Sequence, residues 1–168
     1  MNAVSLARLG EVHPVLSSKI QQLDSILAGE EIEVQVIQGL RSWNQQAALY
    51  AQGRTAPGSI VTNAQPGYSW HNFALAVDLC PAQAFDPAGQ FVPDWNPQHP
   101  AWQTMIAKGE ALGLYSGAEF RTLPDYPHFQ LTGKWPVTPD DEVRQLWKDG
   151  GIQAVWDESG LNDQLTGS

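Results

Sequence analysis

The pattern of hydrophobic and polar residues predicts helices and short strands that alternate unevenly along the chain. Residues 15–28 place apolar side chains on one helical face, and residues 32–37 alternate apolar and polar side chains, as a half-buried strand does. Ser42 and Gln45 have the spacing of a capping box, which predicts a helix over residues 43–52. The first third of the chain is therefore expected to hold two helices with a strand between them.

The rest of the chain continues this mixture. Residues 73–80 form a nearly continuous apolar run, typical of a central strand. Residues 81–99 contain four prolines, which indicates a long surface excursion, and residues 100–112 suit a helix. The segment 128–132 is expected to be a short strand, and a last helix is expected from Thr138 to Gly150.

These elements together predict the α+β class, with helices packed on a small, mainly antiparallel sheet. The chain has 168 residues, which favours a single domain over residues 1–168 and suffices for a sizeable core. The polar segment 157–168 is expected to be a loosely held tail.

Charge narrows the range of partners. The chain has 9 Lys and Arg against 18 Asp and Glu, a net charge of -9. Nucleic acids and anionic membranes reward clusters of basic residues, so we expect neither as a partner. No apolar run approaches the ~20 residues that span a bilayer, so we expect no membrane insertion. The first 22 residues lack the apolar core of a secretory signal, which predicts cytoplasmic synthesis without a signal peptide.

The numbers of cysteines and histidines restrict which disulfides and metal sites the chain can form. Cys80 is the only cysteine, which excludes an intramolecular disulfide and a cysteine-rich zinc site, and we expect it to be a small buried hydrophobe. A transition metal would therefore need histidine and carboxylate ligands. His13 and His99 are expected on the surface, whereas the other two histidines lie in more distinctive segments.

The first such segment runs from Ser69 to Asp78. It places His71 at the mouth of the apolar strand and the carboxylate of Asp78 inside it. An ionised carboxylate in apolar surroundings is costly unless it is paired or binds a metal. Asp78 could equally be satisfied by backbone amides or by an arginine such as Arg41, and this segment alone leaves both interpretations open.

The second segment runs from Pro124 to Gln130. His128 opens the short strand, Asp125 precedes it by three residues, and Pro127 disfavours a helix there. A structural histidine beside a solvated aspartate is one interpretation. The other is catalytic: two imidazoles and one carboxylate suffice to hold Zn²⁺ with a position left for water, and a second carboxylate could act as general base. Spacing alone does not establish that these residues meet.

The two segments read S-x-H-x(6)-D followed by D-x-x-H. This pair resembles the zinc peptidases of the D-alanyl-D-alanine carboxypeptidase and L-alanyl-D-glutamate endopeptidase group (peptidase family M15), and its phage endolysin branch above all. Gly39–Ser42 upstream and residues 140–156 downstream also resemble that family, so the similarity covers roughly residues 35–156. It implies a hedgehog/DD-peptidase-like α+β fold.

The resemblance also implies roles for single residues. The expected ligands of one Zn²⁺ ion are His71, Asp78 and His128. Asp125 would be the catalytic base, and Arg41 would stabilise an oxyanion, grip a substrate carboxylate or hold Asp78 or Asp125 by a salt bridge. The expected substrate contacts are Ser69, Gln45 and Trp70. The family usually has glycine at the position of Ala74, and alanine suits that position if its φ is negative.

The function implied is hydrolysis of a peptide bond in the peptidoglycan stem peptide, with the stem peptide as partner and the protein acting as a monomer. The leading hypothesis is an L-alanyl-D-glutamate endopeptidase of the endolysin kind, which reaches the cell wall after release from the cell. One alternative is a D-alanyl-D-alanine carboxypeptidase or dipeptidase. The other is a zinc-stabilised binding domain without turnover, as in hedgehog-type domains, against which the presence of Asp125 argues.

Overall fold

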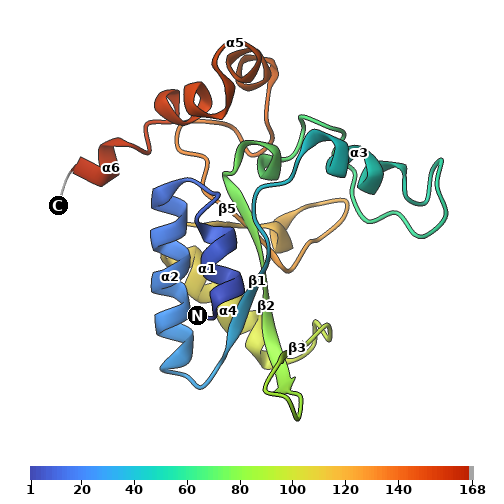
Figure 1. The fold of residues 1–168 in the computed structure, drawn as a ribbon, viewed down its shortest axis with the longest axis vertical. Helices are drawn as coiled ribbons and strands as arrows, with labels where there is room; N and C mark the ends of the chain where they lie inside the picture. The colour runs from blue at the N-terminus through green and yellow to red at the C-terminus, as the bar shows by residue number, and fades with distance from the viewer. Residues whose placement is uncertain (167–168) are drawn as a thin grey trace.

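The computed structural model describes residues 1–166 and is built around a small antiparallel sheet (Figure 1). The sheet order is β1-β2-β5-β4, with β3 paired to the far part of β2. The strands are β1 (Val34–Gln38), β2 (Ala76–Phe85), β3 (Phe91–Pro93), β4 (Tyr115–Ser116) and β5 (His128–Gln130). Strand β2 pairs with three of the other four strands, so it is the centre of the fold.

Helices cover the sheet and extend from it. The α-helices are α1 (Ala3–Leu9), α2 (Pro14–Ala28), α3 (Trp43–Ala51), α4 (Pro100–Ala111), α5 (Asp141–Glu158) and α6 (Asp163–Thr166), and two 3-10 helices are η1 (Trp70–Phe73) and η2 (Gly117–Glu119). In Figure 1, α1, α2 and α4 gather beside the sheet, while α3 lies on an arm that extends away from it. None of the helices within residues 1–166 is both long and apolar enough to cross a membrane.

Two hydrophobic clusters hold these layers together. The larger joins α2 and α4 to the sheet through side chains such as Leu16, Met105 and Phe129. The smaller packs η1 and the start of β2 against α5, with Phe73 and Val155 fully buried. Side chains of the second cluster hold η1 and side chains of both clusters hold β2, so the junction between them is packed from both sides.

The predicted α+β class, with helices on a small antiparallel sheet, is confirmed. The capping box is present as expected: Gln45 donates its backbone N–H to the Ser42 hydroxyl, and its side-chain oxygen accepts the Ser42 N–H. Cys80 is fully buried, as expected, and burial raises the pKa of its thiol to about 12.

The expected strand over residues 73–80 is wrong at its beginning. Residues 70–73 form η1, and the strand starts only at Ala76. Between them Ala74 adopts a left-handed conformation, with φ 53° and ψ 33°, so the condition under which alanine suits this position, a negative φ, is not met. This turn lets the Ala74 N–H bond back to the carbonyls of η1, and it redirects the chain into the sheet.

The C-terminal segment also differs from expectation. Gly151, with φ 71° and ψ -161°, interrupts the helix where an end was predicted, but a second helical turn resumes at once and α5 continues to Glu158. Within the predicted tail, Ser159 and Leu161 are fully buried, Leu161 in the second cluster, whereas residues 163–165 are exposed. The last two residues of the predicted tail, 167–168, lie outside the described chain.

His13 is the other correction. It was expected on the surface, yet its side chain is fully buried against Trp156, with ring centroids 4.9 Å apart. Its Nδ1 accepts the Val15 N–H at the start of α2, and its Nε2 lies 3.2 Å from Asn162. His13 therefore begins a helix and ties it to the C-terminal segment.

Candidate active site

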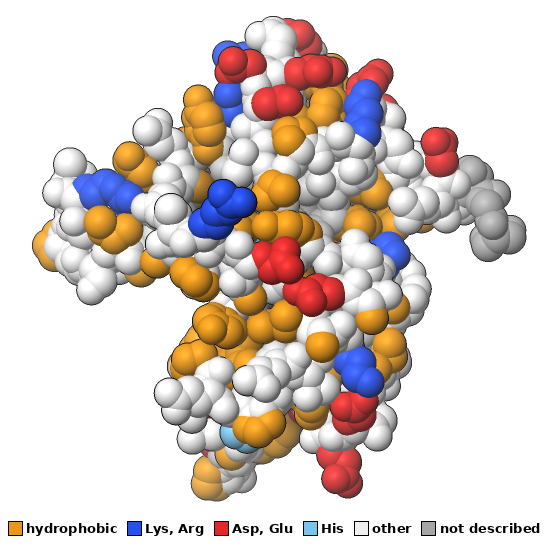
Figure 2. All heavy atoms as spheres, turned by 180° about the vertical axis from the view of Figure 1, so that it is seen from behind, with side chains coloured by type: hydrophobic (Ala, Val, Ile, Leu, Met, Phe, Trp, Pro, Cys, Tyr) orange, Lys and Arg blue, Asp and Glu red, His pale blue; other side chains and the backbone are white. Residues whose placement is uncertain are grey.

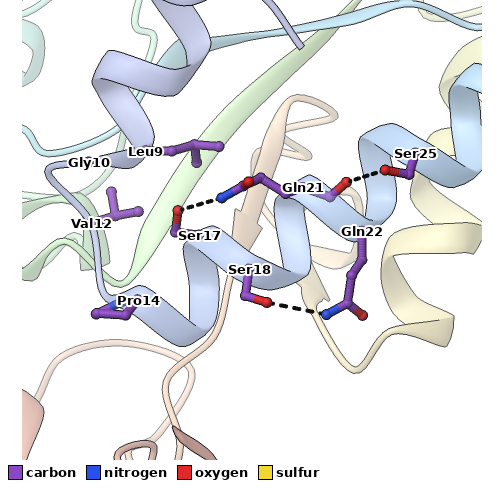
Figure 3. A pocket seen from close by; sticks show the side chains of 9 residues that line it. All are labelled: Leu9, Gly10, Val12, Pro14, Ser17, Ser18, Gln21, Gln22 and Ser25. Atoms are coloured by element: carbon purple, nitrogen blue, oxygen red, sulfur yellow. Dashed lines mark hydrogen bonds between the residues drawn. The ribbon is translucent and has the colours of Figure 1, made fainter.

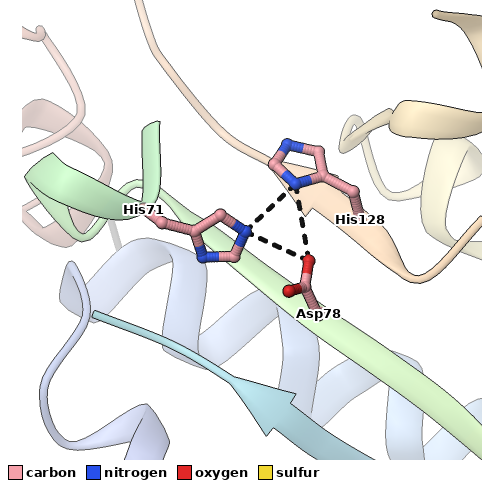
Figure 4. Close-up of side chains that lie close together, drawn as sticks. All are labelled: His71, Asp78 and His128. Atoms are coloured by element: carbon pink, nitrogen blue, oxygen red, sulfur yellow. Dashed lines mark hydrogen bonds and ion pairs between the residues drawn. The ribbon is translucent and has the colours of Figure 1, made fainter. Parts of the chain in front are cut away.

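Three side chains from separate elements converge beside the centre of the sheet (Figure 4). His71 comes from η1, Asp78 from β2 and His128 from the first position of β5. Asp78 and His128 are direct partners across the antiparallel β2–β5 pair, so strand register places them together. The His71 ring reaches them because η1 and the left-handed turn at Ala74 lie immediately before the beginning of β2.

The distances among the three groups suit a metal ion. His71 Nε2 lies 3.0 Å from Asp78 Oδ1 and 3.1 Å from His128 Nδ1, and His128 Nδ1 lies 3.5 Å from Asp78 Oδ1. Ligand atoms ~2.0–2.1 Å from a tetrahedral zinc ion are about 3.3 Å apart, which is the spacing found here. The convergence that spacing alone could not establish is therefore present in the folded chain.

The outer nitrogens of both rings support the same conclusion. His71 Nδ1 lies 2.9 Å from the Gly39 carbonyl, and His128 Nε2 lies 2.9 Å from the side-chain oxygen of Gln130. Both partners are acceptors, so each outer nitrogen carries the proton and each neutral ring turns a lone pair inward. Two lone pairs and a carboxylate that face one another in a buried site fit a cation between them.

Electrostatics keeps Asp78 ionised. Burial alone would raise the pKa of its carboxyl, but His71 and His128 beside it hold that pKa well below its ordinary value. Burial lowers the pKa of His71, which favours the neutral ring that a metal requires, whereas the hydrogen bond and charge of Asp78 outweigh burial and raise the pKa of His128.

Asp125 lies in a turn immediately before β5. Its backbone N–H donates to the Gly117 carbonyl at 2.9 Å, and its own carbonyl accepts the His128 N–H at 3.2 Å. Its side chain lines the same cavity as His71 and His128, a hollow of about 560 Å³. Burial, and then the negative charge of Asp78, raise the pKa of Asp125, and a carboxylate with a raised pKa is better matched to proton transfer near neutral pH.

Arg41 lies between the metal cluster and the cavity. Its Nη2 is 3.2 Å from Asp78 Oδ2 and its Nη1 donates to Gln46 Oε1 at 3.0 Å, while its backbone N–H donates to the His71 carbonyl. Of the interactions considered from the sequence, the salt bridge to Asp78 is present. Arg41 also lines the cavity, so substrate contact remains sterically open to it.

The three predicted substrate contacts differ in their placement. Ser69 lines the cavity next to η1. Trp70 lines the same cavity, although its side chain is only 2% exposed and its indole N–H donates to the Val137 carbonyl, and its contact with substrate stays a prediction. Gln45 is exposed on α3, outside the lining of this cavity, and its side-chain oxygen accepts the Ser42 N–H in the capping box, so its contact with substrate stays a prediction.

Sequence reasoning missed two glutamines beside the site. Gln46 is fully buried and links Arg41 to the Ala64 carbonyl, and Gln130 is 2% exposed beside His128. Side chains two residues apart on a strand share a face, so the two-residue step from His128 to Gln130 was a usable signal. No comparable signal marks Gln46, whose neighbour Gln45 occupies the capping position.

A second hollow lies between α1 and α2, away from the metal cluster (Figure 3). Its lining contains no acidic, basic or histidine side chain, and its serines and glutamines hydrogen-bond along α2.

Figure 2 shows that acidic side chains gather over α5 on the face it presents, while Lys and Arg side chains are scattered. The cavity at His71 is thus where catalytic residue types concentrate among residues 1–166.

Comparison with known proteins agrees with this geometry. Residues 62–131, which hold all three cluster residues and Asp125, match the sequence profile of a D-alanyl-D-alanine carboxypeptidase family. The chain is 31% identical over 128 residues to the peptidoglycan L-alanyl-D-glutamate endopeptidase CwlK of Bacillus subtilis (strain 168), an alignment that covers 72% of this chain and 74% of CwlK.

Solved structures show the same fold. The L-Ala D-Glu endopeptidase ChiX of Serratia marcescens superposes with a TM-score of 0.54 at 25% identity, over 79% of this chain and 89% of ChiX. The LD-carboxypeptidase LdcB superposes with a TM-score of 0.52 at 20% identity, over 83% of this chain and 71% of LdcB, a similarity of fold alone. With the match to CwlK, these findings show that the chain belongs to peptidase family M15 and is a hydrolase of that family.

Proposed function

We propose that this protein is a zinc-dependent endopeptidase that hydrolyses the L-alanyl-D-glutamate bond of peptidoglycan stem peptides, as an endolysin does in cell-wall lysis. The observation that carries the proposal is the meeting of the ligand atoms of His71, Asp78 and His128 at distances that suit one metal ion, beside a cavity that His71, His128 and Asp125 line. CwlK and ChiX, both named for this bond, support the choice of substrate.

Each side chain has a defined part in this reaction. When bound by His71, Asp78 and His128, zinc supplies a Lewis acid that polarises the scissile carbonyl and lowers the pKa of water toward ~7. Asp125 accepts the proton of the attacking water and then delivers it to the departing amine. Arg41 holds the Asp78 carboxylate through its ion pair. The Ser69 hydroxyl, on the cavity wall, contacts the stem peptide.

A digestion of purified cell walls tests the proposal. We expect turbidity to fall with the wild-type protein, to stay constant with a chelator, and to fall again when zinc is restored. Mass spectrometry of the products should show glycan-linked L-alanine and peptides that begin with D-glutamate. Asp125→Ala should retain zinc and lose turnover, whereas His71→Ala should lose both. Wild-type turnover by Asp125→Ala would show that the base is assigned wrongly.

The second candidate is a D-alanyl-D-alanine carboxypeptidase, which the matching family profile favours by its description. This reaction would use the same metal and base but would release a single terminal D-alanine. Mass spectrometry of the same digest separates the two candidates, since one leaves intact D-alanyl ends on the released peptides and the other shortens them by one residue.

A further inference from the structure

Gln130 lies between a metal-site histidine and a loop carbonyl. Its Oε1 is 2.9 Å from His128 Nε2, and its Nε2 donates to the Val137 carbonyl at 2.9 Å. The side chain is almost completely buried, so water does not compete for either contact. The same Val137 carbonyl also accepts the indole N–H of Trp70, the residue that precedes His71. One loop carbonyl therefore hydrogen-bonds to the segments that carry both histidines.

The Val137 carbonyl determines which way the Gln130 amide faces. A carbonyl only accepts hydrogen bonds, so it must meet the NH₂ group of the amide, and the amide oxygen is left to face His128. That oxygen in turn accepts only from a protonated Nε2. The neutral His128 ring is thereby fixed in the tautomer whose Nδ1 lone pair points toward Asp78 and His71.

If the amide were rotated by half a turn, its NH₂ group would face His128. The ring would then accept at Nε2 and carry its proton on Nδ1, toward the metal position, where a ligand lone pair is needed. The rotated amide would also turn its oxygen toward the Val137 carbonyl, so two acceptors would meet in a buried site. The arrangement thus selects one orientation of the amide and one tautomer of the ring.

We propose that Gln130 is a positioning residue for the metal, held in the required orientation by the Val137 carbonyl. Its amide oxygen faces the outer nitrogen of His128 and not the nitrogen turned toward Asp78, so it acts by orienting His128. The inference rests on the metal site of the proposed function and is independent of which peptide bond is cleaved. Hydrogen bonds of this kind behind a metal-bound histidine are worth about 10–100-fold in metal affinity.

Three variants test the proposal by zinc affinity, measured in competition with a chromophoric chelator. Gln130→Met keeps the volume and removes the acceptor, so its affinity should fall by about 10–100-fold. Gln130→Glu keeps an acceptor toward His128, so its affinity should stay within about threefold of wild type, whereas its thermal stability should fall because its second oxygen meets the Val137 carbonyl. Phe129→Leu loosens the same strand from its core-facing side, and its affinity should stay unchanged.

A purely structural role makes a different prediction. Zinc affinity would then follow thermal stability across all three variants, and Gln130→Glu would lose affinity with Gln130→Met. That result, or zinc binding by folded Gln130→Met at wild-type strength, overturns the proposal. Because the readout is metal binding, a failure to cleave the L-alanyl-D-glutamate bond would contradict the proposed function and leave this result standing.

The wild-type protein provides a test that needs no variant. In the zinc-loaded protein labelled with ¹⁵N, long-range ¹H–¹⁵N correlation spectra assign the tautomer of each histidine. We expect His128 to carry its proton on Nε2, with slow exchange because Gln130 accepts it in a buried site. A His128 ring protonated on Nδ1, or an Nε2 proton that exchanges as fast as that of exposed His99, would refute the role assigned to Gln130.

Discussion

Gly117 offers a test of how closely the loop behind the site controls catalysis. It begins η2, and its carbonyl accepts the Asp125 N–H at 2.9 Å. A methyl group added to Gly117 would lie 2.6 Å from the Asp125 carbonyl oxygen and 2.7 Å from His128 Cβ. The substitution Gly117→Ala therefore presses on the proposed base and on one metal ligand at once, without removing any chemical group from the site.

The expected effect follows from these distances. Ordinary contact requires about 3.4 Å, so the backbone of Asp125 or the start of β5 must move by about 0.7–0.8 Å. Overpacking of this kind costs about 1–3 kcal/mol of folding free energy, and a displacement near 1 Å at reacting groups costs about 100-fold in rate. We expect kcat/KM to fall by roughly 100-fold, and the melting temperature to fall by roughly 2–12 °C.

The assay is the rate of release of peptides from purified cell walls, with zinc content and thermal melting measured on the same samples. Gly29→Ala is the matched control, because that glycine has a negative φ at the end of α2 and an added methyl group there meets only helix carbonyls, the nearest at 3.3 Å. A folded Gly117→Ala protein whose kcat/KM stays within threefold of wild type would refute the argument that this loop positions Asp125 and His128.

Substitutions at three further positions test other parts of the structure by urea unfolding. Burial lowers the pKa of His13, so below pH ~6.5 the unfolded chain binds this proton more readily, and the free energy of unfolding decreases as the pH is lowered. His13→Asn should flatten this pH dependence by at most about 1.4 kcal/mol per pH unit, and an unchanged slope would contradict the prediction. Ala74→Gly should change the free energy of unfolding by less than about 1 kcal/mol, because relief of the left-handed strain offsets the lost methyl group and the added entropy of the unfolded chain. Ala74→Val should lower the free energy of unfolding by about 2 kcal/mol or more. Arg41→Met should cost about 1.5–3 kcal/mol in metal-free protein, because it removes one charged partner of the largely buried Asp78 carboxylate; a loss below about 1 kcal/mol would exclude a strong pair.

Most of the fold could be predicted where the signal was local. The helix over Trp43–Ala51 follows from its capping box, and the β1 strand from its alternating side chains. The elements that the sequence did not predict include α1, β3 and β4, which are short and have tertiary partners: β4, with two residues, exists because it pairs with β5. The left-handed turn at Ala74 was missed for a similar reason, since packing around a fully buried alanine overrides its preference for negative φ.

In the candidate site, too, the sequence predicts what depends on local signals and does not predict what depends on tertiary contacts. Residue types and motif spacing singled out His71, Asp78 and His128, but the orientation of the surrounding polar side chains depends on contacts between distant segments. The Trp70 indole N–H donates to the Val137 carbonyl, 67 residues away, a contact that no local pattern predicts. The Gln45 side chain, by contrast, hydrogen-bonds to the nearby Ser42 N–H, as the spacing of the capping box predicts.

The D-x-x-H motif shows why this site could be anticipated from so short a pattern. The Asp125 carbonyl accepts the His128 N–H, so the proposed base and one metal ligand lie at the two ends of a single tight turn. Their separation is therefore set by local backbone geometry. The same histidine begins β5 directly opposite Asp78, so the sheet register, and no additional loop, brings the turn to the metal cluster. A one-residue slip of β5 would move His128 to the opposite face of the sheet and separate base, ligand and cluster together.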